Sequence, residues 1–161
     1  MPSPPISELG VQFTPGSNRW NDRFDFVIDG EPLKDCLIRQ EEARGRINEI
    51  SSLPSFKGLF RSGLSHHRDS FLTGYAARRQ PPFSNLAPVM ACECGETVCG
   101  GVWTKIFVSS NYVNWSGFRF WDSSSIQPSP TYDSRMRVFD RTQYESLIAQ
   151  LVDRDEDTAN E

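Results

Sequence analysis

Residues 101–118 read GVWTKIFVSSNYVNWSGF, two runs of β-branched and aromatic residues separated by a Ser-Ser-Asn connection. Two such runs around a short polar connection predict an antiparallel hairpin, with strands at 101–108 and 112–118. Side chains alternate along a strand, and Trp115 on the second strand is placed for a cross-strand aromatic contact. Val102, Thr104, Ile106 and Val108 line one face of the first strand, and Trp103, Lys105 and Phe107 line the other.

A helix is predicted after the hairpin, in the stretch 138–152, VFDRTQYESLIAQLV. Asp140 can cap the helix with Gln143 as its capping-box partner, and Phe139 and Tyr144 can form a hydrophobic staple across the first turn. Its apolar stripe, suited to docking on a sheet, consists of Tyr144, Leu147, Ile148 and Leu151.

The first half of the chain predicts two more strands and a helix. Strands are expected at 11–14 and 24–28, followed by a turn at Asp29-Gly30. Pro32 then suits the start of a helix. In this helix Leu33, Cys36 and Leu37 share one face, which favours burial of the Cys36 thiol in the core.

The remaining segments are less regular. LAPVMA at 86–91 predicts a buried strand, and a short helix is expected around 70–77. The stretch 122–134 is rich in Ser and Pro and is expected to be a loop. Together these elements predict a single α+β domain at 9–152, with one mainly antiparallel sheet covered by two helices.

Composition limits where the chain works and what it binds. No apolar run reaches the roughly 18 residues of a membrane span, and the first residues lack the features of a secretory signal, so we expect a cytoplasmic protein. Residues 1–8 and the acidic tail 153–161 are expected to be disordered. The tail holds five acids and one Arg, a net charge of −4 that equals the charge of the whole chain. The segment from Lys57 to Gln80 has five basic residues and one acid, but basic and aromatic residues do not interleave there as on a nucleic-acid platform, so nucleic acid is not the expected partner.

Three of the four cysteines lie close together in 91–101, ACECGETVCGG. Cys92, Cys94 and Cys99 could supply three thiolates to a structural zinc ion, and the neighbouring glycines would allow tight turns and close backbone approach around it. Two other interpretations stay open at this point. The cysteines could be reduced thiols without a ligand role, or they could serve redox or nucleophilic chemistry.

A zinc site needs a fourth ligand, and the sequence offers three candidates. Cys36 is the predicted ligand, with His66 and His67 as alternatives. If the protein supplied only three ligands, water could complete the coordination, and catalysis would become possible.

The C-x-C-x4-C spacing locally resembles the post-SET zinc motif of histone lysine methyltransferases, which supplies zinc ligands. That family takes a further cysteine from an upstream Asn-His-Ser-Cys motif, which this sequence lacks. The likeness therefore implies zinc binding and not methyl transfer.

Over a longer span the chain resembles a group of small uncharacterised bacterial proteins. The matching pieces are CECGETVC, VNWSGF and VFDRTQYESLIAQL, together with FDFVIDGEPLKDCL near the N-terminus. Where that pattern has an aromatic residue after the last cysteine, this chain has Gly100-Gly101. The resemblance implies a compact α+β domain of bacterial type.

No Gly-rich phosphate loop, nucleophile elbow or HExxH motif is present. The sequence therefore favours a protein-binding module, similar in size and acidity to an immunity or inhibitor protein, with a protein partner and a structural cysteine cluster. The alternative is a thiol- or zinc-dependent enzyme, or a redox sensor, that uses Cys92, Cys94 and Cys99.

Overall fold

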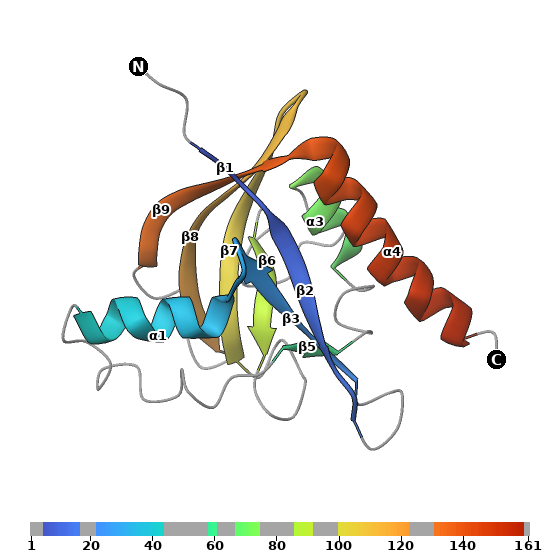
Figure 1. The fold of residues 1–161 in the computed structure, drawn as a ribbon, viewed down its shortest axis with the longest axis horizontal. Helices are drawn as coiled ribbons and strands as arrows, with labels where there is room; N and C mark the ends of the chain where they lie inside the picture. Colours follow the sequence, from blue (N-terminus) through green and yellow to red (C-terminus); the bar gives the residue numbers. More distant parts are fainter. Residues whose placement is uncertain are drawn as a thin grey trace.

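The computed structural model describes residues 5–16, 22–43, 58–60, 67–74, 86–91, 100–122 and 131–159. In these ranges the chain forms two β-sheets and three helices (Figure 1). The strands are mainly antiparallel, so the predicted α+β class is confirmed. None of the described helices is both long and apolar enough to cross a bilayer.

The larger sheet, sheet A, has five strands in the order β1-β9-β8-β7-β6. In chain order they are β1 (Ile6–Ser7), β6 (Leu86–Ala91), β7 (Gly100–Val108), β8 (Tyr112–Asp122) and β9 (Thr131–Asp140). Strands β6 to β9 form an antiparallel meander, and β1 joins the outer edge of β9 in parallel. The predicted hairpin is β7–β8, at the centre of the sheet, with Val108 opposite Val113.

The smaller sheet, sheet B, is built around β3. Its strands are β2 (Leu9–Thr14), β3 (Arg23–Ile28), β4 (Glu31–Pro32) and β5 (Leu59–Phe60). All of the strands expected from the sequence are present, but they belong to two sheets rather than one. The stretch expected as a loop at 122–134 gives its first residue to β8 and its last four residues to β9.

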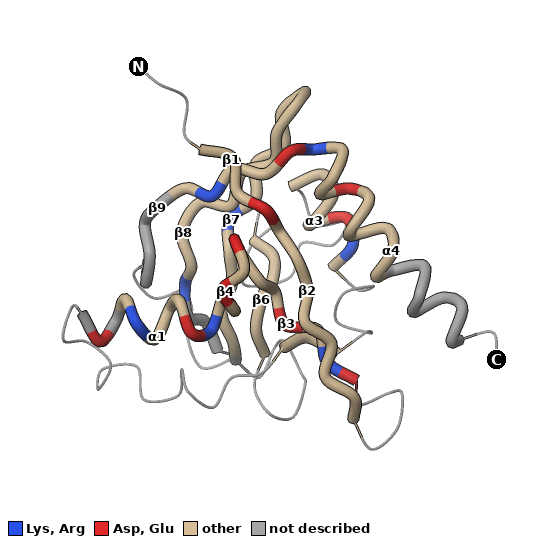
Figure 2. The backbone as a smooth tube through the Cα atoms, viewed as in Figure 1, with Lys and Arg blue, Asp and Glu red and all other residues tan. Residues whose placement is uncertain are grey.

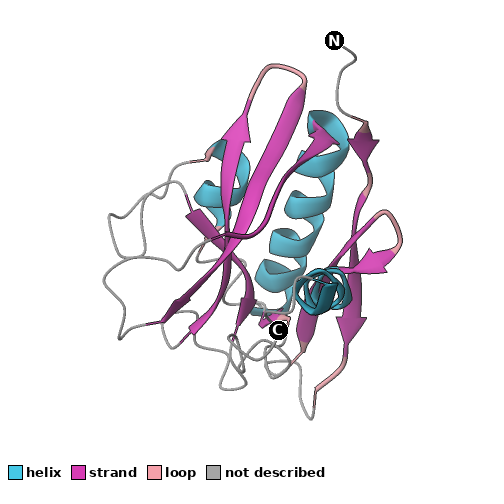
Figure 3. Ribbon diagram, turned by 90° about the vertical axis from the view of Figure 1, so that its left-hand side faces the viewer, coloured by secondary structure: helices cyan, strands magenta, loops and turns pink. Residues whose placement is uncertain are grey.

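The helices are α1 (Leu33–Ala43), α3 (Arg68–Thr73) and α4 (Arg141–Ala159). Helix α3 ends where Gly74 adopts a left-handed φ of 79°, which glycine accepts without strain. Helix α4 continues into the segment expected to be a disordered tail, and β1 lies in the N-terminal segment expected to be disordered. In Figure 3, α1 and α4 lie on the side of sheet A that faces sheet B.

Trp115 of β8 lies at the centre of the core between the two sheets. Its ring meets Phe26 of sheet B edge-on at a centroid distance of 5.2 Å and Phe139 of β9 at 5.2 Å. Tyr144 of α4 and Phe71 of α3 lie within 6.4 Å. The fully buried Trp115 side chain therefore contacts both sheets and two of the helices, α3 and α4.

A β-bulge lets two neighbouring aromatic residues of β8 reach the same core. Trp115 and Phe118 are three positions apart, so strict alternation would turn them to opposite faces. The pairing with β7 and β9 shifts between Ser116 and Phe118, and Gly117 there has a φ of 76°. Its carbonyl accepts a hydrogen bond from the buried Thr104 hydroxyl at 2.7 Å.

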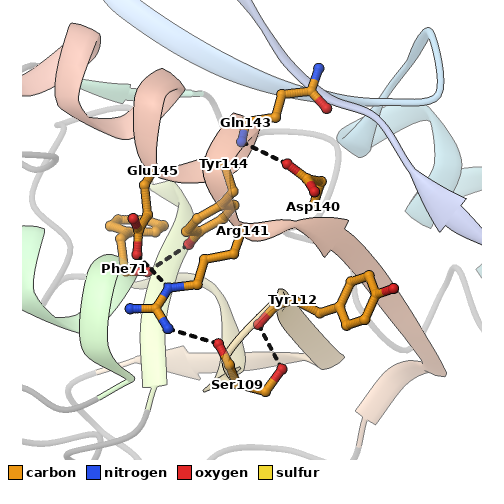
Figure 4. A network of polar contacts seen from close by, with 8 residues as sticks. All are labelled: Phe71, Ser109, Tyr112, Asp140, Arg141, Gln143, Tyr144 and Glu145. Atoms are coloured by element: carbon orange, nitrogen blue, oxygen red, sulfur yellow. Dashed lines mark hydrogen bonds and ion pairs between the residues drawn. The ribbon is translucent and has the colours of Figure 1, made fainter.

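The start of α4 has the N-cap and the staple expected from the sequence, but the Gln143 side chain points away from Asp140 and does not complete the capping box (Figure 4). The Asp140 carboxylate accepts a hydrogen bond from the Gln143 backbone N–H at 2.9 Å, and Phe139 stacks on Tyr144 at 6.0 Å. Arg141 adds a link to the β7–β8 connection, where it donates to the Ser109 carbonyl at 2.9 Å. The predicted N-cap and hydrophobic staple are thus confirmed.

The chain passes from sheet A to sheet B through one residue, Glu8, which joins β1 to β2. Across from it lies the turn between β3 and β4, where Asp29 and Gly30 have φ angles of 53° and 82°. Positive φ at both central residues is typical of a type I′ hairpin turn. This turn holds the crossover by two hydrogen bonds between Glu8 and Asp29.

Candidate functional site

The predicted zinc ligands Cys92, Cys94 and Cys99 lie outside the described residues, as does His66. The structure does describe the strands on either side of the cysteine stretch. Ala91 at the end of β6 pairs with Gly101 near the start of β7. The stretch therefore connects two neighbouring antiparallel strands.

Gly101 has a packing role of its own at this connection. A Cβ atom on Gly101 would overlap the Met90 carbonyl oxygen and lie 3.2 Å from the Ala91 Cα. The β6–β7 register shifts between Pro88 and Met90, close to this contact. The close backbone approach that the sequence suggested near the cysteines is thus present between two strands, where it needs no metal.

Cys36 lies on the first turns of α1, buried with Leu33 and Leu37 as expected. Its sulfur is surrounded by nitrogen donors. Gln40 Nε2 lies 3.3 Å from the Cys36 Sγ, Arg137 Nη2 of β9 lies at 3.5 Å, and Arg39 Nη2 lies at 4.0 Å. A zinc ion on this thiol would lie beside two guanidinium groups, an unfavourable Coulomb interaction.

Glu31 balances part of that positive charge. Arg39 Nη2 lies 2.6 Å from its Oε1 oxygen. This hydrogen bond holds the pKa of the Glu31 carboxyl below its ordinary value, opposed by burial and assisted by a hydrogen bond with Cys36 and the charges of Arg39 and Arg137. In the described ranges, no three His, Cys, Asp or Glu side chains come together as a metal site. Zinc binding by the cysteine stretch, with Cys36 as fourth ligand, stays a prediction.

His67, the other histidine candidate, precedes α3. Its ring meets the Trp103 ring edge-on at a centroid distance of 5.4 Å. Trp103 and Leu86 form a small buried cluster apart from the main core. This cluster lies on the outer face of sheet A, which we define as the face opposite the Trp115 side chain.

The outer face also carries most of the large apolar side chains that remain exposed in the described residues. Strand pairing brings them together, since Ile6 lies opposite Val138, Val138 opposite Asn114, and Asn114 opposite Phe107. Met136 follows on the same side of β9. Four exposed residues of this face form a surface that we call the apolar strip. They are Ile6, Phe107, Tyr112 and Met136, which are 56%, 47%, 41% and 51% exposed.

Two half-buried cations lie on the same face. Lys105 Nζ is 5.2 Å from the centroid of the Phe107 ring, a cation–π distance. Arg119 pairs across the sheet with Trp103. Figure 2 marks basic residues along sheet A, but Arg137 of β9 pairs with Trp115 and so lies on the inner face, apart from these two cations.

Sequence reasoning found only part of this surface. The alternation in β7 correctly placed Lys105 and Phe107 on one face with Trp103. The positions of Met136 and Ile6 on this face were not predicted, because β9 and β1 were not expected to be strands. The one signal in β9 is the alternation of Met136 and Val138 with Arg137 and Phe139, in a segment next to a Ser/Pro-rich stretch.

No protein-family model, no curated protein and no solved structure matches this chain.

Proposed function

We propose that the chain is a protein-binding module and that the apolar strip is its binding surface. The observation that carries the proposal is the gathering of four exposed large apolar side chains on one sheet face. The opposite face of the same sheet already forms the core, so the strip is not needed to hold the fold together. Contiguous exposed apolar surface rimmed by polar residues is typical of interaction sites.

The proposal also covers the type of protein, its compartment and the role of its cysteines. A small acidic α+β chain that acts by binding suits the immunity or inhibitor type of protein, working in the cytoplasm on a protein partner. Cys92, Cys94 and Cys99 would then have a structural role in holding zinc, with Cys36 as the predicted fourth ligand even though Arg39 and Arg137 lie beside its sulfur. A rigid sheet is a suitable platform for such binding, since its side chains lose little freedom when a partner docks.

Site-specific photo-crosslinking in the native host tests the binding surface. A photoreactive phenylalanine analogue is placed at Tyr112 in the strip or, as a matched control, at Phe13, which is 39% exposed on β2 of sheet B. We expect a crosslink to a different protein from Tyr112 only, and its loss when Phe107→Asp is added. Crosslinks of equal yield from both positions, or only to a second copy of the chain, would overturn the proposal.

A further inference from the structure

The two cations on the outer face differ from the other basic residues whose ion pairs the structure shows. Arg39 pairs with Glu31, and Arg141 pairs with Glu145. Lys105 and Arg119 are half-buried, yet among the described residues neither has a carboxylate within salt-bridge distance. A cation that has lost part of its water without gaining an anion is prepared to bind one.

In the described part of the chain, the outer face itself supplies little negative charge. Asp140, opposite Tyr112, is the one acidic residue that strand pairing places there among residues whose side chains are described. Its carboxylate already accepts the Gln143 N–H at the start of α4. Lys105 lies beside Phe107, so positive charge adjoins exposed apolar surface, and none of the carboxylates whose positions are described forms an ion pair with it.

Resting on the proposed function, we infer that the apolar strip, with Lys105 and Arg119, binds an acidic polypeptide whose carboxylates adjoin large apolar side chains. The apolar side chains of the partner would cover Phe107 and Met136, and its carboxylates would pair with the two cations. Such complementarity selects a partner by charge and also speeds its approach.

Two other occupants fit this surface less well. A second copy of the chain docked face to face would add the same two cations to the interface and, among the described residues that strand pairing places there, only the Asp140 carboxylate, so the charges would not match. The acidic tail at 153–161 supplies carboxylates, but its largest apolar side chain is alanine, which cannot cover Phe107.

Peptide selection on the intact protein tests this inference. A phage-displayed random peptide library is selected on the wild-type chain, with counter-selection on Phe107→Asp. Enriched peptides are synthesised with a fluorescent label, and binding is followed by anisotropy. We expect peptides that combine Asp or Glu with Leu, Ile, Phe or Trp. The double variant Lys105→Gln/Arg119→Gln should bind them about tenfold more weakly, and added salt should weaken binding to the wild type.

The matched control is Lys34→Gln/Arg68→Gln, which makes the same change in net charge on α1 and α3. It should bind as the wild type does, and thermal unfolding of each variant checks that it is folded. The selected peptides could prefer the wild type over Phe107→Asp and yet be neutral or basic. That result would overturn the inference that the partner is acidic and would leave the proposed binding surface in place. No peptide that distinguishes them would overturn the binding surface itself. Tight binding of single-stranded oligonucleotides in place of peptides would overturn both.

Discussion

The Asp29 carboxylate accepts a hydrogen bond from the Glu8 backbone N–H at 2.8 Å, and the Asp29 N–H donates to the Glu8 carbonyl at 2.9 Å. Glu8 is the residue at which the chain leaves sheet A for sheet B. This pair therefore fastens the two sheets at one corner and fixes the direction of β1.

Replacing Asp29 should loosen that corner. Asp29→Ala removes the acceptor and puts alanine at a φ of 53°, which Asp and Asn tolerate better, so we expect a loss of about 1–3 kcal/mol in the free energy of unfolding. Asp29→Asn keeps a side-chain acceptor and also tolerates the positive φ, so its free energy of unfolding should fall much less. Urea unfolding of the two variants makes the comparison, and equal losses would contradict the role given to the carboxylate.

Tyr144→Phe tests the polar contact inside the core. The Tyr144 hydroxyl donates to the Phe71 carbonyl at 2.8 Å and accepts from Trp115 Nε1 at 3.3 Å. The variant leaves both groups buried without this partner, so we expect a loss of about 1–3 kcal/mol in denaturant unfolding. Burial also raises the pKa of the hydroxyl well above its ordinary value, so Tyr144 should stay protonated in alkali until the fold opens. An ordinary titration of Tyr144 in the native protein, followed by absorbance, would contradict the buried contact.

Gly101→Ala tests the close approach of β6 and β7. The new Cβ would overlap the Met90 carbonyl oxygen, so the strands must separate, at a cost of about 1–3 kcal/mol. Gly10→Ala in sheet B is the matched control, because the nearest atom to its Cβ would be 3.9 Å away. Thermal unfolding should show a lower midpoint for Gly101→Ala than for Gly10→Ala, and similar midpoints would contradict the packing.

Glu31 should contribute to stability in a pH-dependent way. Its pKa is lowered in the folded chain, mainly by the Arg39 hydrogen bond, so its contribution is present above the ordinary value of 4.5 and is lost as the pH falls through the lower folded value. The pair is exposed, so the effect is small. Glu31→Gln should therefore be less stable than wild type at neutral pH and equal to it in acid. A difference that persists in acid would point to packing instead of charge.

Metal analysis tests the cysteine stretch. We expect about one zinc per chain, lost in Cys92→Ser, Cys94→Ser and Cys99→Ser and accompanied by a lower unfolding temperature. If Cys36 is the fourth ligand, Cys36→Ser also releases zinc. Retention of zinc in that variant would leave Cys36 as a buried thiol beside Gln40 and Arg137 and move the fourth ligand to His66 or His67. Absence of zinc from the wild type would remove the metal proposal.

The parts of the fold that follow local rules were predictable from the sequence. The Asp140 cap, the Phe139–Tyr144 staple and the alternating faces of β7 depend on residues close together in the chain. The division into two sheets was not predictable, because it depends on pairings such as Ile6 with Val138, and β1 is too short to show a pattern. The apolar strip follows from the same pairings, so the sequence could show only its part in the β7–β8 hairpin.

Strand β1 has one more consequence, for the order of events in folding. Among the described residues it pairs with β9, where Ile6 lies opposite Val138 and Ser7 lies opposite Phe139, so its partner comes from a distant part of the sequence. During synthesis β1 must therefore wait until β9 has left the ribosome before sheet A can be completed. Until then the edge of the unfinished sheet is unpaired, so we expect aggregation to be most favoured in the interval before β9 emerges.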